Sequence, residues 1–238
     1  MLGNHQTQHF TLSAETENLA MPEIHVREED GDYEVKNIIF DMGGVLPGKT
    51  IGQVLAAYTE DVQLRQVLKT EVIDSVEWQM TDRGTLRDEE AAERICERVA
   101  QEYRDAIRDF LLTFRQAPDP NPEMAGIVKR LRDEGYGLYL FSNVGYRYRK
   151  FFPYLDPNPL KEMDGVWTSC EHGVLKPEPE AYQSMLDTFG LHPEECLFID
   201  DSAANVEQGI RMGMKGIVYH GDPTRLKNEL ERMLGLAH

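Results

Sequence analysis

The chain has 238 residues, with 25 Lys and Arg against 42 Asp and Glu, which gives a formal net charge of −17 at pH 7. This length allows one large domain, or one domain that carries a smaller insert. The negative charge and the lack of any block of Lys and Arg argue against nucleic acid and against a membrane surface as partners, since both attract clustered positive charge. We therefore expect small molecules, metal cations or other proteins as partners, and the sequence leaves the oligomeric state open.

The cysteines and the lengths of the apolar stretches indicate in which cellular compartment the protein is expected. Cys96, Cys170 and Cys196 lie far apart without CxxC spacing, which fits neither a disulfide framework nor a zinc site. No stretch approaches the roughly 20 apolar residues of a membrane span, and the N-terminus lacks the apolar core of a signal peptide. These features predict a cytoplasmic protein. Residues 1–35 are polar and acidic and are expected to form an N-terminal extension.

The first predicted element is a strand over residues 35–41, VKNIIFD, a short apolar run that ends at a carboxylate followed by glycines. Between about residues 50 and 115 the pattern becomes helical, over 51–58, 67–80 and 88–114, with a break at Gly84. A segment with Pro118, Pro120 and Pro122 then returns the chain to alternating elements.

After that segment, strands and helices alternate to the end of the chain. Strands are predicted over 136–142, 164–169, 196–200 and 215–221, and helices over 123–135, 178–190, 202–213 and the C-terminal segment. Such alternation predicts an α/β fold, with a doubly wound parallel sheet covered by helices on both faces. The helical block then lies at the carboxyl ends of the strands, where open α/β sheets bind ligands. We therefore expect a core of residues 36–49 and 117–238 and a small α-helical cap over 50–116.

Polar residues that a packed core does not need follow four of the predicted strands. They are Asp41 with Gly43 and Gly44, Ser142 with Asn143, Lys176 with Pro177, and Asp200 with Asp201. Because parallel strands all end at the same edge of a sheet, we expect these groups to gather there.

The residue types in this cluster predict phosphoryl-transfer chemistry. Carboxylates that face one another repel, and a cation among them relieves the repulsion. Oxygen ligands suit Mg²⁺, which binds one or two carboxylates together with phosphate oxygens. One carboxylate could attack phosphorus and form an aspartyl-phosphate that water hydrolyses. Lys176, Ser142 and the metal would bind the phosphoryl oxygens meanwhile.

The order FDMGGVL, LFSN, LKPEPEAY and LFIDDSAAN resembles the haloacid dehalogenase-like superfamily of hydrolases and phosphatases, over about residues 37–221. The position of the helical block resembles a cap of the C1 type, inserted between the first and second motifs. The resemblance implies a Rossmann-like core and a Mg²⁺-dependent phosphatase. It also implies roles for single residues. Asp41 would be the nucleophile and a metal ligand, and the carbonyl of Gly43 and the carboxylates of Asp200 and Asp201 would be further metal ligands. Ser142 and Lys176 would bind phosphate, Lys176 would also be catalytic, and Asn143 and Asn205 would be lesser supports of phosphate binding.

Gly43 departs from the family pattern. Phosphatases of this family usually have Asp two residues after the nucleophile, as general acid and then general base, and Gly43 replaces it here. The FD-x-G-[GN]-V pattern is similar to a subgroup of sugar-phosphate phosphatases that includes enzymes acting on glucose 1-phosphate. Because a general acid contributes roughly 10²–10⁴-fold to a rate, we expect a preference for less basic leaving groups, such as those of anomeric, aryl or acyl phosphates.

Three alternative functions fit parts of the sequence. Residues 43–50, GGVLPGKT, match the P-loop pattern of an NTPase with Lys49, but this interpretation gives the other strand-end residues no role. A hydrolytic dehalogenase would use Asp41 without a metal, so the carboxylates after the fourth strand speak against it. A non-catalytic protein that binds phosphate esters would explain the missing acid at Gly43.

In the helical block, the sequence WQMTDRGT offers Trp78, Thr81 and Arg83 as residues that could face a substrate. A place in the core of an amphipathic helix is the simpler prediction for Trp78.

Overall fold

The computed structural model describes residues 33–47, 50–113, 121–150 and 158–236. Most of the N-terminal extension predicted over 1–35 therefore lies outside the described residues, as do Gly48, Lys49, Pro118 and Pro120. Within the four described ranges, no helix is long and apolar enough to span a bilayer.

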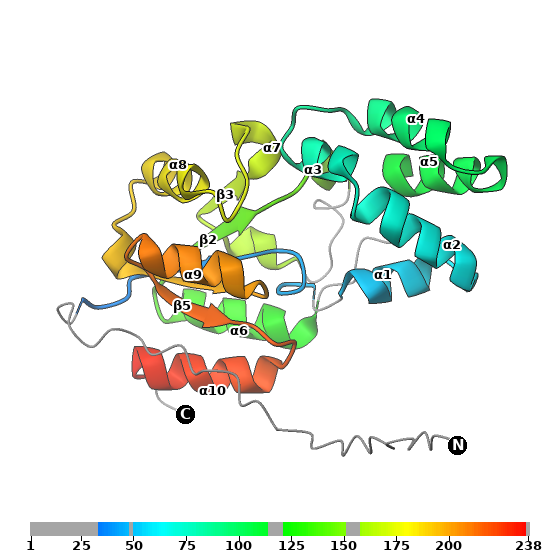
Figure 1. Cartoon of the computed structure of the whole chain (residues 1–238). Coiled ribbons are helices and arrows are strands. Elements are labelled where there is room, and N and C mark those ends of the chain that lie inside the picture. Colours follow the sequence, from blue (N-terminus) through cyan, green and yellow to red (C-terminus); the bar gives the residue numbers. More distant parts are fainter. Residues whose placement is uncertain (1–32, 48–49, 114–120, 151–157, 237–238) are drawn as a thin grey trace, which may run out of the picture. The chain divides into compact units, whose positions relative to one another are not determined.

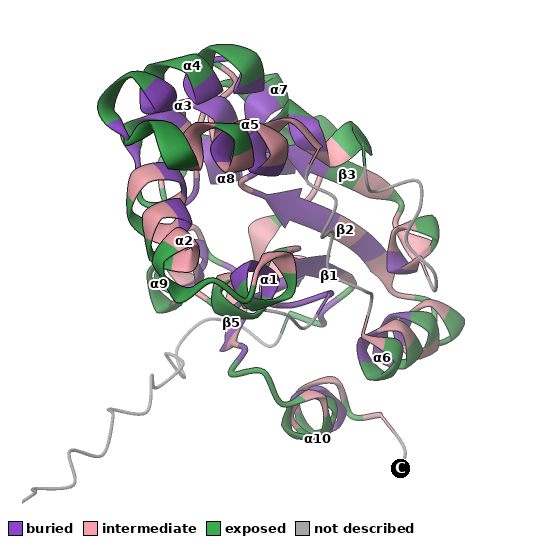
Figure 2. Ribbon diagram, turned by 90° about the vertical axis from the view of Figure 1, so that its right-hand side faces the viewer, coloured by how far each residue is buried: buried purple, intermediate pink, exposed green. Residues whose placement is uncertain are grey.

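One parallel sheet forms the centre of the described chain (Figure 1). Its strands are β1 (Asn37–Phe40), β2 (Gly137–Ser142), β3 (Gly165–Thr168), β4 (Cys196–Asp200) and β5 (Lys215–Val218), in the spatial order β3-β2-β1-β4-β5. Phe40 at the end of β1 pairs with Leu140 of β2 and with Ile199 of β4. The central strands are mostly buried (Figure 2), as expected for a parallel sheet covered on both faces. The predicted doubly wound α/β fold is confirmed.

Helices cover both faces of the sheet. They are α6 (Pro122–Asp133), α8 (Pro179–Phe189), α9 (Ala203–Arg211) and α10 (Pro223–Leu234). Ile38 and Phe40 of β1 share a hydrophobic cluster with α6 and α10. Ile39, between them, joins Tyr182 of α8 and Phe198 of β4 on the other face, because side chains alternate along a strand. Figure 1 shows α9 on the same side as α8.

Short elements complete the connections that follow the strands. They are the 3-10 turn η3 (Tyr146–Lys150) after β2, the turn η5 (Pro159–Glu162) before β3, the single helical turn α7 (Ser169–His172) after β3, and the turn η6 (Pro193–Glu195) before β4.

Between β1 and α6 the described chain is helical, over residues 51–113, which we call the helical insertion. Its elements are α1 (Ile51–Tyr58), α2 (Val62–Val67), the π-helical turn η1 (Leu68–Ile73), α3 (Val76–Asp82), α4 (Asp88–Arg98), the 3-10 turn η2 (Gln101–Tyr103) and α5 (Arg104–Thr113). These helices bury a hydrophobic cluster of their own, which includes Leu68, Ile95 and Phe110 and is separate from the two clusters of the sheet.

Two helical stretches that were predicted as continuous are interrupted. Between η1 and α3, the Ser75 hydroxyl accepts the Trp78 N–H at 3.1 Å and donates to the Val72 carbonyl at 2.6 Å, so Ser75 caps a new helix. Between α4 and η2, Val99 and Ala100 are extended. Both sides of each break contribute to one apolar cluster, so the helical periodicity runs through the breaks and does not reveal them.

Gly84 ends the segment after α3, as predicted, and the structure gives the reason. Its φ is +78°, and a Cβ there would collide with the Cys170 carbonyl of α7. Glycine therefore allows the turn and a close approach of the insertion to the core.

Candidate active site

Three carboxylates meet at the carboxyl ends of the adjacent strands β1 and β4. Asp41 follows β1 directly, Asp200 ends β4 and Asp201 comes next. One oxygen of each carboxylate lies within 4.8 Å of the others. Asp41 and Asp200 are buried, whereas Asp201 is exposed. The structure thus brings Asp41 together with two side chains that lie 159 and 160 residues further along the sequence.

Lys176 reaches into this cluster from the loop between α7 and α8. Its ammonium donates to Asp41 Oδ1 at 2.7 Å, to Asp200 Oδ2 at 2.6 Å and to the Phe141 carbonyl at 2.8 Å. Burial lowers the pKa of Lys176, but the carboxylates of Asp41 and Asp200 outweigh this effect, so its pKa lies above the usual value. The side chain is therefore a charged ammonium at neutral pH, fixed between two carboxylates.

Asp41 has a raised pKa in this cluster. Burial, and to a lesser extent the charges of Asp200 and Asp201, raise the pKa of Asp41 to about 7 against the opposing effect of Lys176. A cation bound among these carboxylates would keep Asp41 ionised at lower pH. The donor atoms are all oxygens, which fits Mg²⁺ better than a softer metal.

Amide groups orient the charged residues. Asn143, after β2, accepts the Lys176 backbone N–H at 2.9 Å and donates to the Lys176 carbonyl at 2.8 Å. Asn205 of α9 donates to both carboxylate oxygens of Asp200, at 3.1 and 3.0 Å. The sequence analysis missed the Ser202 backbone N–H, which donates to Asp200 Oδ1 at 2.8 Å, and the Tyr182 hydroxyl, which donates to the Asn205 carbonyl at 2.6 Å. A backbone donor has no sequence signal, and a tyrosine in an apolar helix face predicts packing alone.

Ser142 ends β2, on the side of β1 that lies away from β4. The residue is buried. Ser142, Asp41 and Asp200 thus follow one another across three neighbouring strand ends.

The two glycines after Asp41 have different surroundings. At Gly44, φ is +73° and a Cβ would collide with the Asp201 carboxylate, so this position requires glycine. Gly43 has no such conformation, and a Cβ there would lie 3.8 Å from Asp41 Oδ2, an ordinary van der Waals contact. A Cβ therefore fits at position 43, and neither the backbone conformation nor the space at Cβ requires glycine there.

The P-loop interpretation finds no support at Thr50. In a P-loop this hydroxyl binds Mg²⁺, whereas here it accepts the Gln53 N–H as the N-cap of α1, with the Gln53 side chain bonded to the Thr50 N–H in return. Leu55 of α1 packs in the cluster of the helical insertion. Lys49 lies outside the described residues.

Comparison with known proteins places these observations in a family. Residues 35–213 match the model of the haloacid dehalogenase-like hydrolases. A sesquiterpene phosphatase of Aspergillus oryzae is 26% identical over 210 residues, which cover 84% of this chain and 97% of the phosphatase. Acyl-CoA dehydrogenase family member 10 of Mus musculus is 28% identical over 86% of this chain, which spans only 20% of that larger protein. A flavin mononucleotide hydrolase of Arabidopsis thaliana is 38% identical over 44% of this chain and 42% of its own length.

Solved structures share the fold. A haloacid dehalogenase family enzyme of Bacteroides thetaiotaomicron, in complex with magnesium and inorganic phosphate, superposes with a TM-score of 0.60 at 22% identity, over 81% of this chain and 98% of the enzyme. An L-2-haloacid dehalogenase of Xanthobacter autotrophicus superposes with a TM-score of 0.56 at 16% identity, over 76% of each chain. Since the matched family segment begins before β1, ends after α9 and contains every strand-end group of the carboxylate cluster, the chain belongs to the haloacid dehalogenase-like hydrolases.

Proposed function

We propose that this hydrolase is a Mg²⁺-dependent phosphatase that cleaves a small phosphate monoester through a covalent phosphate on Asp41. The observation that carries the proposal is the Lys176 ammonium, bonded to both Asp41 and Asp200, with Asp201 completing a set of three carboxylates. An arrangement of this kind binds a cation and an anionic phosphoryl group together.

Asp41, Asp200 and Asp201, with the carbonyl of Gly43, would bind Mg²⁺, which supplies positive charge that offsets the charge of the phosphoryl group. A carboxylate oxygen of Asp41 attacks phosphorus, and the bond from phosphorus to the ester oxygen breaks. The departing oxygen takes its proton from water, because position 43 carries no carboxyl group. A second water then attacks phosphorus, which releases inorganic phosphate and restores the Asp41 carboxylate.

Neighbouring residues prepare the site for this reaction. The Lys176 ammonium neutralises a phosphoryl oxygen, and the Ser142 hydroxyl donates a hydrogen bond to another. Asn143 does not need to touch the substrate, because its two hydrogen bonds to the Lys176 backbone already fix the loop that carries the ammonium. The helical insertion is the main part of the cap that the sequence predicts over residues 50–116, and it covers the leaving group.

The names of the relatives support organic phosphates as substrates. One relative is called a sesquiterpene phosphatase and another a flavin mononucleotide hydrolase, and one neighbour was solved with magnesium and phosphate. We propose a sugar phosphate as the first substrate class to test, because its anomeric oxygen is a weakly basic leaving group that tolerates the absence of an acid at Gly43. Terpenoid and flavin phosphates are the two comparison classes.

The test is phosphate release from sugar, terpenoid, flavin and aryl phosphates, with Mg²⁺ and with a chelator. The variants are Asp41→Asn, which keeps the size of the side chain and an oxygen for Lys176, and Asp222→Asn as control. Asp222 also carries a carboxylate after a strand, but it caps α10, and Asn is an equally good cap. We expect metal-dependent release that falls at least about a thousandfold in Asp41→Asn and persists in Asp222→Asn.

Three outcomes would contradict the proposal. Full activity of Asp41→Asn would show that Asp41 is not the nucleophile. Halide release from 2-haloacids without metal would identify a dehalogenase. Binding of phosphate esters without turnover would identify a non-catalytic binding protein.

A further inference from the structure

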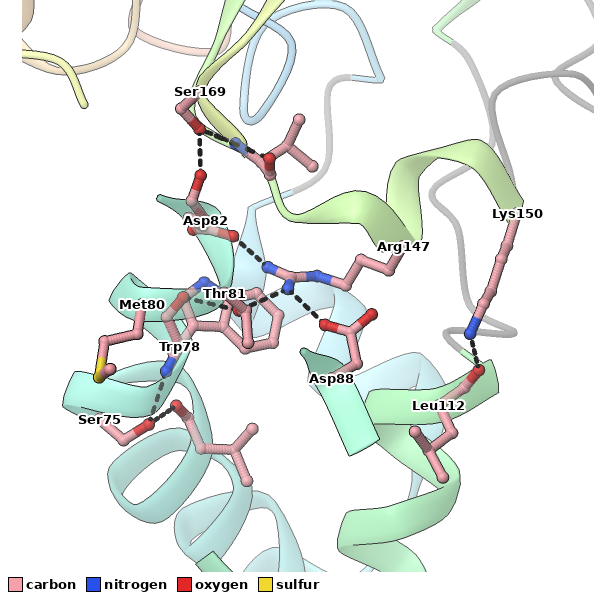
Figure 3. A network of polar contacts seen from close by, with 12 residues as sticks. Ser75, Trp78, Met80, Thr81, Asp82, Asp88, Leu112, Arg147, Lys150 and Ser169 are labelled. Carbon is pink, nitrogen blue, oxygen red and sulfur yellow. Dashed lines mark hydrogen bonds and ion pairs between the residues drawn. The ribbon is translucent and has the colours of Figure 1, made fainter. Parts of the chain in front are cut away.

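Arg147 is a buried cation outside the carboxylate cluster. It lies in η3, five residues after Ser142, and is 2% exposed. All the side chains bonded to its guanidinium belong to the helical insertion (Figure 3). The guanidinium donates to the Thr81 hydroxyl at 2.9 Å, to Asp88 at 3.3 Å and to Asp82, and lies 3.7 Å above the ring of Trp78.

These contacts join the end of α3 to the start of α4. Trp78, Thr81 and Asp82 belong to α3, whereas Asp88 is the first residue of α4. Burying a guanidinium costs free energy unless its N–H groups are hydrogen-bonded. Because the group is planar, its hydrogen-bond partners must lie in a few fixed directions. One side chain of the core therefore fixes the position of two helices of the insertion.

A second set of contacts connects the same region to the strand ends. The Ser169 hydroxyl accepts the Val144 N–H at 2.9 Å and donates to the Asp82 carbonyl at 2.5 Å (Figure 3). A Cβ at Gly145 would lie 3.0 Å from the Thr81 carbonyl, so this loop touches α3 directly. The segment of residues 143–147 thus contacts the insertion directly. Asn143, at the start of this segment, also fixes the loop that carries Lys176.

Two further bridges join the core to the insertion, and neither is as buried. Lys150, at the other end of η3, donates to the Leu112 carbonyl near the end of α5 at 2.7 Å (Figure 3). Arg83 pairs with Glu178 before α8, but these side chains are 34% and 35% exposed, and such ion pairs are weakened by solvent and salt. Arg147 is therefore the most buried of these connections and the one least screened by solvent.

We propose that Arg147 is a positioning residue of the hydrolase, which holds the helical insertion against the phosphate-binding strand ends so that the insertion contacts the leaving group of the ester. The kinetic part of this inference rests on the proposed phosphatase activity. Inorganic phosphate has no leaving group, so its binding should be independent of Arg147, whereas binding and turnover of the ester should depend on it.

The kinetic test compares Arg147→Met and Arg147→Lys with Arg98→Met. Arg98 is a matched control, because it also pairs with two carboxylates, Glu71 and Glu77, but all three residues lie within the insertion. We expect kcat/KM of the preferred ester to fall at least tenfold in Arg147→Met, while inhibition by inorganic phosphate shifts less than twofold. Arg147→Lys should recover part of the loss, and Arg98→Met should leave both quantities near wild type.

A distance measurement tests the same inference without activity. Spin labels on cysteines introduced at Glu97 of α4 and Thr188 of α8, both exposed, report the separation of insertion and core by electron–electron double resonance. The native cysteines are buried. We expect the distance distribution to broaden in Arg147→Met and to stay as in wild type in Arg98→Met. Asp88→Asn leaves the ion pair between Arg147 and Asp82 in place, so it should broaden the distance distribution less. This variant replaces Arg147→Met in the experiment if Arg147→Met does not fold.

Equal distance distributions in wild type and in the folded variants of Arg147 and Asp88 would overturn the inference. The inference would also be overturned if Arg147→Met raised the KM of the ester and weakened inhibition by inorganic phosphate to the same extent. Arg147 would then act on the phosphate pocket itself. If wild type hydrolyses no ester, the proposed function fails, and the distance distributions still decide whether Arg147 holds the insertion.

Discussion

Gly43 is the residue at which this chain differs most from an acid/base-assisted phosphatase. The position accepts a Cβ, which would make only an ordinary contact with Asp41. In Gly43→Asp, we expect the hydrolysis of alkyl phosphates to rise by about 10-fold or more, because a carboxyl group beside the nucleophile can protonate the leaving oxygen. Aryl phosphates should change little. The measurement is kcat/KM against the pKa of the leaving group, which should fall steeply in wild type and less steeply in the variant.

Gly43→Asn is the control for this substitution, because Asn has the size of Asp and no acidic proton. It should keep the steep dependence of wild type. A leaving-group series that is already flat in wild type would contradict the idea that the missing acid limits turnover.

Single residues of the site differ in how far the sequence predicts them. Asp41, Ser142 and Asp200 were expected to meet, because each ends or follows a short apolar strand and parallel strands share an edge. Arg147 was not expected to be buried. It stands in a polar run, GYRYRK, and its partners Thr81 and Asp88 are 66 and 59 residues away, so no local pattern marks it.

At the scale of elements, the positions of strands were easier to predict than the ends of helices. The strands of the sheet are buried apolar runs bounded by turns, and each one lies inside a predicted range. The break at Ser75 depends on a hydrogen bond between a side chain and the backbone, and helical periodicity does not record such bonds. Trp78 was expected in the insertion core, and it does lie against Phe110, with ring centroids 6.4 Å apart, but the Arg147 guanidinium also lies over its ring.

The end of α3 gives a prediction for the pH dependence of stability. Burial raises the pKa of Asp82 from 3.8 to about 6, in spite of the neighbouring Arg147 charge. The folded protein therefore binds a proton that the unfolded chain releases between about pH 4 and pH 6. This contribution to stability is present below about pH 4 and is lost as the pH rises through about 6. In Asp82→Asn the contribution is absent, so the Tm difference, wild type minus variant, should be larger at pH 5 than at pH 7.5 by about 2–4 °C.

Asp74→Asn is the control for the pH effect. Asp74 also lies in the insertion and pairs with a lysine, but its side chain is 50% exposed. The Tm difference between wild type and Asp74→Asn, measured at both pH values, is the reference from which the pH effect of Asp82→Asn is counted. A Tm difference for Asp82→Asn that does not depend on pH would show that this carboxyl group titrates normally.

At the scale of the whole molecule, the insertion and the sheet are stabilised by separate hydrophobic clusters. The polar groups of the site come from the strand ends and from the loops and helices of the core, whereas the insertion is linked to the core through Arg147, Lys150, Ser169 and Glu178. The family fold and the carboxylate cluster could therefore be predicted from strand patterns. The substrate could not, because the residues that would contact a leaving group depend on how the insertion packs against the core.

The charge of the whole chain and the carboxylate cluster together predict the response to Mg²⁺. A ligand that binds only the folded state at a hundred times its Kd stabilises it by about 2.7 kcal/mol, which in a chain of this size raises Tm by about 5–10 °C. We expect this increase in wild type and in Asp222→Asn, and less than half of it in Asp201→Asn, whose exposed side chain can be changed without disturbing the core. Ionic strength is kept constant, because a net charge of −17 is screened by any salt. An equal increase in Asp201→Asn and Asp222→Asn would mean that Mg²⁺ acts on the overall charge and that the cluster is not its site.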